Sequence, residues 1–128
     1  MKNKIIFSIF IVFLVFALIG CSGIITPDIL SANFIITEWK QTYYEYIEEW
    51  SDYVYVYYEI ENTGNVEIDY YKVYFTVNCM GGSQYYDWTN GLSVGVGKKY
   101  SDWTMVNVAG KKAISVEITD WELENWWF

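Results

Sequence analysis

The sequence predicts an all-β protein, an antiparallel β-sandwich of about seven strands that follows an N-terminal signal segment. Two observations lead to this fold class. Several runs alternate apolar and polar residues, as strands with one buried face do. Turns rich in Gly and Asn separate these runs at nearly regular intervals, and the 128-residue chain has almost no helical pattern.

Residues 1–20 are predicted to be a signal segment. Lys2 and Lys4 precede a run from Ile5 to Ile19 that is apolar apart from Ser8. As a helix this run would span roughly 22 Å, which is shorter than a bilayer core of about 30 Å. A signal peptide fits this length better than a membrane-spanning helix.

The end of that segment, Leu18-Ile19-Gly20-Cys21, resembles the lipobox of bacterial lipoproteins. The resemblance implies cleavage after Gly20, a lipid on Cys21 and usually an additional acyl chain such as palmitate. Two or more acyl chains anchor a protein stably in a membrane, because each buried CH₂ group contributes about 0.8 kcal/mol to membrane binding. An uncleaved anchor that continues to Ile25 is the competing interpretation. Both interpretations place the domain outside the cytoplasm on a membrane, with a tether over 21–32 and one sandwich domain over 33–128.

The domain is strongly acidic and lacks the common catalytic side chains. The chain has sixteen acidic and eight basic residues and no histidine, and Lys2 and Lys4 belong to the signal segment. Such a surface argues against nucleic acid as a partner, because phosphates require cations. Without histidine there is no Ser-His-Asp arrangement and no imidazole metal ligand. We therefore expect a protein that is not an enzyme and has no cofactor or metal.

The segment 34–39 is expected to form the first strand, and 40–52 is ambiguous. Four residues there have helical spacing, although Tyr and Trp favour strands: Tyr43, Tyr46, Ile47 and Trp50. We predict a loop with one helical turn. Its four acids could offer oxygens to calcium: Glu45, Glu48, Glu49 and Asp52. EF-hand spacing is absent, and a solvated acidic loop is the preferred interpretation.

The clearest pattern runs from Tyr53 to Val77. Four alternate residues should form a buried face of one strand: Val54, Val56, Tyr58 and Ile60. Asn62-Thr63-Gly64-Asn65 provides a turn. Beyond it, the apolar parity changes between Ile68 and Tyr71. Because a strand cannot change face in mid-run, we predict a bulge or corner at 69–71.

Further strands are expected at 84–89, 100–108 and 114–119. Turns are predicted at 78–83, at Asn90-Gly91, at 95–99 and at 109–112. Cys79 has no intramolecular disulfide partner if Cys21 is lipidated. We expect its side chain to be a small buried hydrophobe rather than an intermolecular cross-link.

Part of this region is similar to the FxLYD family and to CARDB-like Ig-like domains. Asn62-Thr63-Gly64 matches the end of a strand in those domains, and the stretch 92–99 occupies the place of their L-x-x-G-x-x pattern. The namesake motif falls on 75–79, where Phe75 matches and Asn78 and Cys79 replace Tyr and Asp. The resemblance implies an Ig-like fold and an extracytoplasmic adhesion, binding or spacer module without catalytic residues.

The abundance of aromatic residues points to a binding surface. Thirteen Tyr and seven Trp are present, and such side chains stack on sugars and dominate protein interfaces. The candidate binding face is Tyr53, Tyr55 and Tyr57, with Tyr74 on the neighbouring strand. The competing interpretation is that tyrosine covers the sheet and tryptophan fills the core.

Two further features have open interpretations. Asp87 and Asp102 could act together as a glycan hydrolase, which is the least favoured alternative. Trp126-Trp127-Phe128 is expected to pack on the sandwich rather than insert into a membrane interface.

These patterns together predict a lipid-anchored, extracytoplasmic, non-catalytic binding or adhesion module of the cell envelope, with a glycan or an envelope protein as its partner. A structural lipoprotein that docks on another envelope protein is the alternative.

Overall fold

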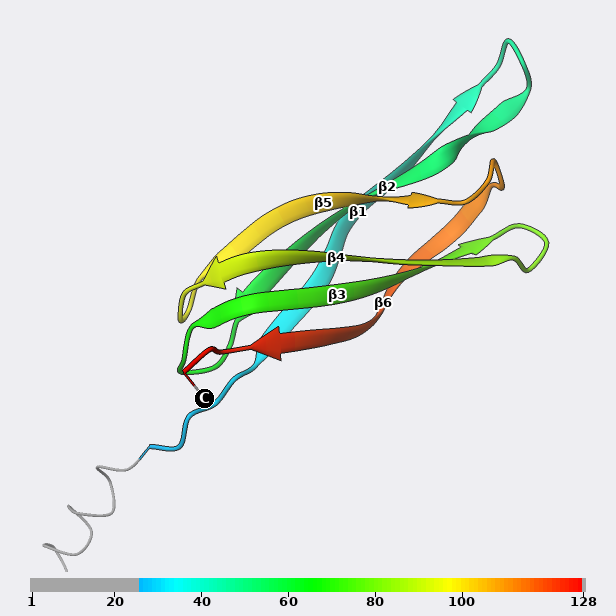
Figure 1. The fold of residues 1–128 in the computed structure, drawn as a ribbon. Helices are drawn as coiled ribbons and strands as arrows, with labels where there is room; N and C mark the ends of the chain where they lie inside the picture. Colours follow the sequence, from blue (N-terminus) through cyan, green and yellow to red (C-terminus); the bar gives the residue numbers. More distant parts are fainter. Residues whose placement is uncertain (1–25, 128) are drawn as a thin grey trace, which may run out of the picture.

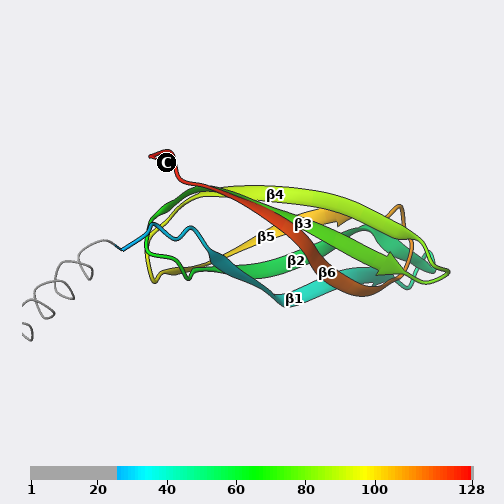
Figure 2. The ribbon, with the colours of Figure 1, turned by 90° about the horizontal axis from the view of Figure 1, so that it is seen from below.

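The computed structural model describes residues 26–127, which form two antiparallel three-stranded sheets packed as a sandwich (Figure 1 and Figure 2). The first sheet has the order β1-β2-β5, and the second has the order β4-β3-β6. The strands are β1 Ala32–Tyr44, β2 Glu49–Asn62, β3 Ile68–Cys79, β4 Gln84–Val94, β5 Lys99–Asn107 and β6 Ala113–Glu124. The sandwich prediction is confirmed, with six strands in the described part instead of about seven. The predicted signal segment and Cys21 lie outside the described residues.

The core lies between the sheets, as the alternation predicts. Every member of the β2 apolar face is fully buried: Val54, Val56, Tyr58 and Ile60. Val73, Phe75 and Val77 cover it from β3 and are also buried. Burial of such side chains contributes about 1.5–3 kcal/mol each, so β2 and β3 supply much of the stability of the fold.

The predicted change of face on β3 is present in the burial pattern. Ile68 and Tyr71 are both buried although they are three residues apart. The predicted bulge is absent from the β3–β4 pairing, because Ile68 pairs with Val94 and Tyr71 pairs with Gly91 in one register. Ser93 on the facing part of β4 has φ 58°, a left-handed conformation that is uncommon outside glycine. The change of face thus coincides with an irregular backbone conformation on the neighbouring strand.

The loop predicted over 40–52 is wrong, because both strands continue through most of it. β1 reaches Tyr44 and β2 begins at Glu49, which leaves only a turn over 45–48. Tyr43 pairs with Trp50, and their ring centroids are 4.8 Å apart. Cross-strand aromatic pairs stabilise a hairpin, so the helical spacing was coincidental. This hairpin extends past the other strands at the end away from residue 26 (Figure 1).

The turn predicted at Asn90-Gly91 is also wrong, since both residues lie inside β4. Gly91 stands opposite Tyr71, and a Cβ at this position would overlap the Tyr71 ring. A glycine within a strand often marks such a close approach. The turns predicted near 78–83, 95–99 and 109–112 are present.

Asn62 fixes the turn that carries the chain from β2 to β3. Its side chain is 2% exposed, and its Nδ2 donates to the carbonyl oxygens of Val66 at 2.8 Å and Val94 at 2.9 Å. Its Oδ1 accepts from the backbone N–H of Gly64 at 3.0 Å. This one side chain thus joins the turn to the end of β4.

The same turn holds the incoming chain against the sandwich. The backbone N–H groups of Thr63 and Asn65 donate to the carbonyl oxygens of Ser31 and Ile29, at 3.1 and 3.0 Å. The Asn65 side chain also accepts from the Ile29 N–H and donates to the Pro27 carbonyl oxygen. We call this set of contacts the tether clamp.

Cys79 is buried at 2% exposure and is a free cysteine, so the expectation of a small buried side chain is confirmed. Burial raises the pKa of its thiol. In the described part of the chain, no helix is long and apolar enough to cross a membrane.

Candidate functional site

The three β2 tyrosines of the predicted face lie on the outer face of the β1-β2-β5 sheet. Tyr53 and Tyr55 are 43% and 36% exposed. The Tyr55 ring is 6.0 Å from Trp103 on β5, and Lys40 Nζ lies 5.5 Å from the centroid of the Tyr57 ring. These side chains form a contiguous surface along one sheet.

Tyr74 does not belong to that surface, so its grouping with the β2 tyrosines is wrong. β3 belongs to the β4-β3-β6 sheet, and Tyr74 points outward on that side of the sandwich. The chain after Asn62 crosses to the second sheet instead of returning beside β2. Two outer faces therefore carry aromatic residues, one on each sheet.

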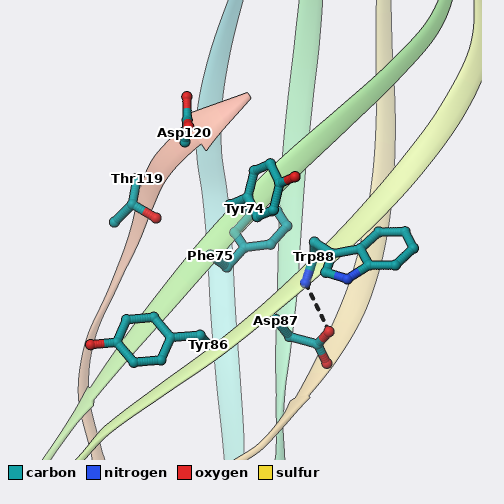
Figure 3. Close-up of a pocket in the computed structure, with 7 residues that line it drawn as sticks. All are labelled: Tyr74, Phe75, Tyr86, Asp87, Trp88, Thr119 and Asp120. Atoms are coloured by element: carbon teal, nitrogen blue, oxygen red, sulfur yellow. Dashed lines mark hydrogen bonds between the residues drawn. The ribbon is translucent and has the colours of Figure 1, made fainter. Parts of the chain in front are cut away.

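The outer face of the β4-β3-β6 sheet contains a cavity of about 550 Å³, which we call the aromatic hollow (Figure 3). It is bordered by residues with aromatic, hydroxyl and carboxylate side chains: Tyr74, Phe75, Tyr86, Asp87, Trp88, Thr119 and Asp120. Of these, the Phe75 side chain itself packs in the core. Small-ligand sites commonly have volumes of about 300–1,000 Å³. The hollow is thus large enough for a small ligand or for one unit of a polymer.

Strand register explains how the hollow forms. Tyr74 pairs with Trp88, and the next outward pair along the strands is Thr76 with Tyr86. Thr76 is short, and its hydroxyl oxygen lies 3.4 Å from that of Thr119 on β6. The short side chains of Thr76 and Thr119 thus lie near three large aromatic side chains, and of the two threonines Thr119 lines the hollow.

A bulge in β6 brings two consecutive residues to the hollow. Tyr74 pairs with Asp120 but Phe75 pairs with Ile118, so Thr119 has no partner on β3. In a regular strand, neighbouring side chains point to opposite faces, whereas a bulge redirects one of them. The bulge therefore lets both Thr119 and Asp120 line the hollow.

Lys72 supports the aromatic pair from the side away from the hollow. Its Nζ lies 4.0 Å from the Trp88 ring centroid and 5.0 Å from that of Tyr74. By register, Lys72 stands on one side of the Tyr74–Trp88 pair and Thr76 stands on the other. The Tyr74 hydroxyl donates to Glu122 Oε1 at 3.1 Å. These contacts hold both rings in place before any ligand binds.

The two aspartates of the hollow each use one oxygen for the backbone. Asp87 Oδ1 accepts from the Trp88 N–H, and Asp120 Oδ1 accepts from the Trp121 N–H, both at 2.8 Å. The second carboxylate oxygen of each has no hydrogen bond from another described residue. Each aspartate therefore has one further acceptor at the edge of the hollow. Asp120 pairs with the outward Tyr74, whereas Asp87 pairs with the core residue Phe75 and lies at the exposed β4 edge.

Asp102 and Trp103 on β5 repeat this Asp-Trp unit, with the same 2.8 Å bond. The Asp-Trp pair occurs twice in the sequence, at 87–88 and at 102–103. This repeat could have identified Trp88 as a site residue, which the alternation pattern alone did not.

The carboxylate pair considered for hydrolysis is divided between the sheets. Asp87 lies on β4 and Asp102 on β5, both are exposed, and only Asp87 lines the hollow. The acids of the hairpin turn lie elsewhere: Glu48, Glu49 and Asp52 border a cavity of about 380 Å³. Among residues 26–127, no group of three or more His, Cys, Asp or Glu side chains is arranged to hold a metal.

The C-terminal residues are exposed, so the expected packing of Trp126-Trp127 on the sandwich is wrong. Trp126 is 65% exposed and Trp127 is 93% exposed. Both backbone and side-chain groups are hydrogen-bonded here. The Trp126 N–H donates to Asp69 Oδ2 at 2.7 Å, and the Trp126 indole N–H donates to Glu124 Oε2 at 3.4 Å. Asn125 Nδ2 donates to the Glu67 carbonyl oxygen at 2.8 Å. These bonds position the segment but leave both indole rings exposed.

In comparisons with known proteins, no family model and no curated protein matches this chain. The similarity to the FxLYD and CARDB-like domains stays a prediction.

Proposed function

We propose that this protein is a lipid-anchored, extracytoplasmic, non-catalytic binding or adhesion module of the cell envelope, with an Ig-like sandwich as its domain. The observation that carries the proposal is the aromatic hollow. Tyr86 and Trp88 are 70% and 48% exposed at its edge. Large aromatic side chains at the surface bind partners at low cost in side-chain entropy, and they dominate the energetics of known interfaces.

The competing explanation is that these aromatic residues only cover the sheet. Side chains with that role would lie flat against small neighbours and fill the space between them. Here Lys72 and Glu122 hold Tyr74 and Trp88 beside an open cavity. This arrangement supports a binding role.

The proposed anchor is a lipid on Cys21, and the arrangement of the domain suits it. The described chain enters at one end of the sandwich, and the β1–β2 hairpin projects from the other end (Figure 1). An anchor preceding residue 26 would leave both outer faces and the hairpin accessible.

Metabolic labelling with palmitate tests the anchor. The wild-type protein should be labelled and should sediment with membranes, and Cys21→Ala should lose the label. Label retained by Cys21→Ala would contradict the lipoprotein proposal.

Binding of the purified full-length protein to envelope fractions tests the module. Trp88→Ala should reduce binding, whereas Trp103→Ala should not, because Trp103 lies on the opposite sheet. Equal binding by the wild-type protein, Trp88→Ala and Trp103→Ala would contradict a role for the hollow. A hydrolytic activity abolished by Asp87→Asn or Asp102→Asn would favour the hydrolase alternative instead.

A second candidate function is assembly with another envelope protein through the hairpin tip. Tyr46 and Ile47 are 82% and 48% exposed there, and apolar side chains at a projecting tip favour a protein partner. Stoichiometric co-purification of one partner, lost in Tyr46→Ser/Ile47→Ser but kept in Trp88→Ala, would support it. Co-purification insensitive to both changes would oppose it.

A further inference from the structure

We infer that the aromatic hollow binds neutral carbohydrate, with a sugar ring stacked against Trp88 and Tyr86. This inference rests on the proposed binding function and adds the ligand class. Three properties of the hollow lead to it: the exposure of its aromatic rings, the type of its polar groups and the position of Lys72.

The aromatic rings offer a surface for the C–H face of a sugar. Tyr86 is the most exposed ring of the hollow, at 70%, and Trp88 stands two residues along the same strand face. Figure 3 shows the two rings extending to different sides of the β4 ribbon, with Tyr74 close to Trp88. The hollow opens on the outer face of the sheet, which suits one unit of an extended polymer better than a fully enclosed small molecule.

The polar groups of the hollow require a ligand that donates hydrogen bonds. Asp120 has a carboxylate oxygen that accepts no bond from another described residue, Thr119 adds a hydroxyl group, and the Asp87 carboxylate lies at the neighbouring β4 edge. Hydroxyl groups of sugars donate strongly to carboxylates. The same two negative charges oppose acidic ligands such as uronic acids and phosphates.

A cationic ligand is the main competitor, because aromatic rings and carboxylates also attract ammonium groups. Lys72 argues against it. Its ammonium nitrogen is 4.0 Å from the Trp88 centroid and 5.0 Å from the Tyr74 centroid, so these rings already have a cation beside them. A second cation would be repelled, whereas a neutral sugar would not. A neutral sugar is therefore compatible both with the carboxylates of Asp87 and Asp120 and with the ammonium group of Lys72.

The test uses full-length protein in detergent and a panel of named probes. The neutral hexasaccharides are those of the β-1,4-glucose, β-1,4-mannose, β-1,4-xylose and β-1,4-N-acetylglucosamine series. Polygalacturonate serves as the acidic probe and hexalysine as the cationic probe. We expect saturable binding of at least one neutral probe, measured by calorimetry and by tryptophan fluorescence.

A matched pair of variants locates the site. Trp88→Ala should weaken binding of the neutral probe by about tenfold or more, as loss of a central aromatic contact does. Trp103→Ala changes the same Asp-Trp-Thr unit on the other sheet, where the exposure of Trp is 51% against 48% for Trp88, and should leave affinity within about twofold. Affinity for the neutral probe should change little with salt concentration, because an uncharged ligand has no charge–charge interaction for salt to screen.

The other outcomes separate the two proposals. Suppose that hexalysine binds in a salt-sensitive and Trp88-dependent way, or that polygalacturonate binds in a Trp88-dependent way. Either result would overturn the neutral-sugar inference and leave the proposed binding module intact. The neutral-sugar inference alone would also fail if envelope fractions bind through Trp88 but no neutral probe does. An affinity for the neutral probe that is lost equally in Trp88→Ala and Trp103→Ala would refute the hollow as the site. No Trp88 dependence toward the probes or the envelope fractions would remove both proposals.

Discussion

Gly91→Ala should destabilise the fold strongly although it adds a single methyl group. A Cβ at this position would overlap the Tyr71 ring. The ring has little freedom to move, because it packs 5.7 Å from Phe34 and 6.4 Å from Tyr58, and its hydroxyl oxygen lies 2.9 Å from that of Tyr58. Overpacking costs about 1–3 kcal/mol, and disruption of the buried hydroxyl pair costs roughly 1–3 kcal/mol more. We expect the free energy of unfolding to fall by about 2–6 kcal/mol.

Urea denaturation followed by tryptophan fluorescence measures this change, and two controls test its cause. Gly95→Ala places a Cβ 3.3 Å from the flexible Lys98 side chain, so its effect should stay within about 1 kcal/mol. In a Tyr71→Leu background the outer ring atoms are absent, and Gly91→Ala should then cost less than about 1 kcal/mol. Equal costs of Gly91→Ala in both backgrounds would refute the steric explanation.

Three further predictions concern buried polar groups. Asn62→Ala should lower the free energy of unfolding in urea by about 2–4 kcal/mol, because it leaves buried backbone groups unpaired; a loss below roughly 0.5 kcal/mol would contradict this role. Burial raises the pKa values of Tyr58 and Tyr71, so only the unfolded state releases these protons as pH rises above about 10, and stability should fall there. A spectrophotometric titration in which both phenols ionise before unfolding would disprove it. Cys79 should react with a disulfide reagent only on unfolding, since burial disfavours its thiolate; fast labelling of native protein would exclude this.

The part of the fold that alternation determines was predictable. The buried positions of β2 follow directly from the period of two, and so does the change of face before Tyr71. The prediction of a turn at Gly91 was wrong because glycine occurs both in tight turns and at close approaches inside strands. A glycine after asparagine is typical of a tight turn, and only the position of the Tyr71 ring shows that close approach is the reason here.

The candidate site was predictable only in part. Alternation predicts that Tyr55 and Tyr74 each point away from the buried side of their own strand. It does not predict that the two strands belong to different sheets. Counting outward from a three-residue loop over 80–82 would have paired Tyr74 with Trp88, but a two-residue Gly81-Gly82 turn would have paired Tyr74 with Thr89, and the sequence does not distinguish the two loops. The contribution of Thr119 could not have been found this way, because it depends on a β6 bulge that no residue pattern marks.

The tether clamp has a mechanical consequence for an anchored module. A pull toward the membrane would reach Ile29 and Ser31 first, where the turn at 63–65 holds the chain. Beyond the clamp the pull would run along β1, which lies antiparallel to β2 over nearly its whole length and along the long axis of the sandwich (Figure 1). A load in that direction shears many backbone hydrogen bonds at once instead of opening them one by one. With the proposed anchor ahead of residue 26, the domain would therefore resist tension between that anchor and a partner bound to its outer faces.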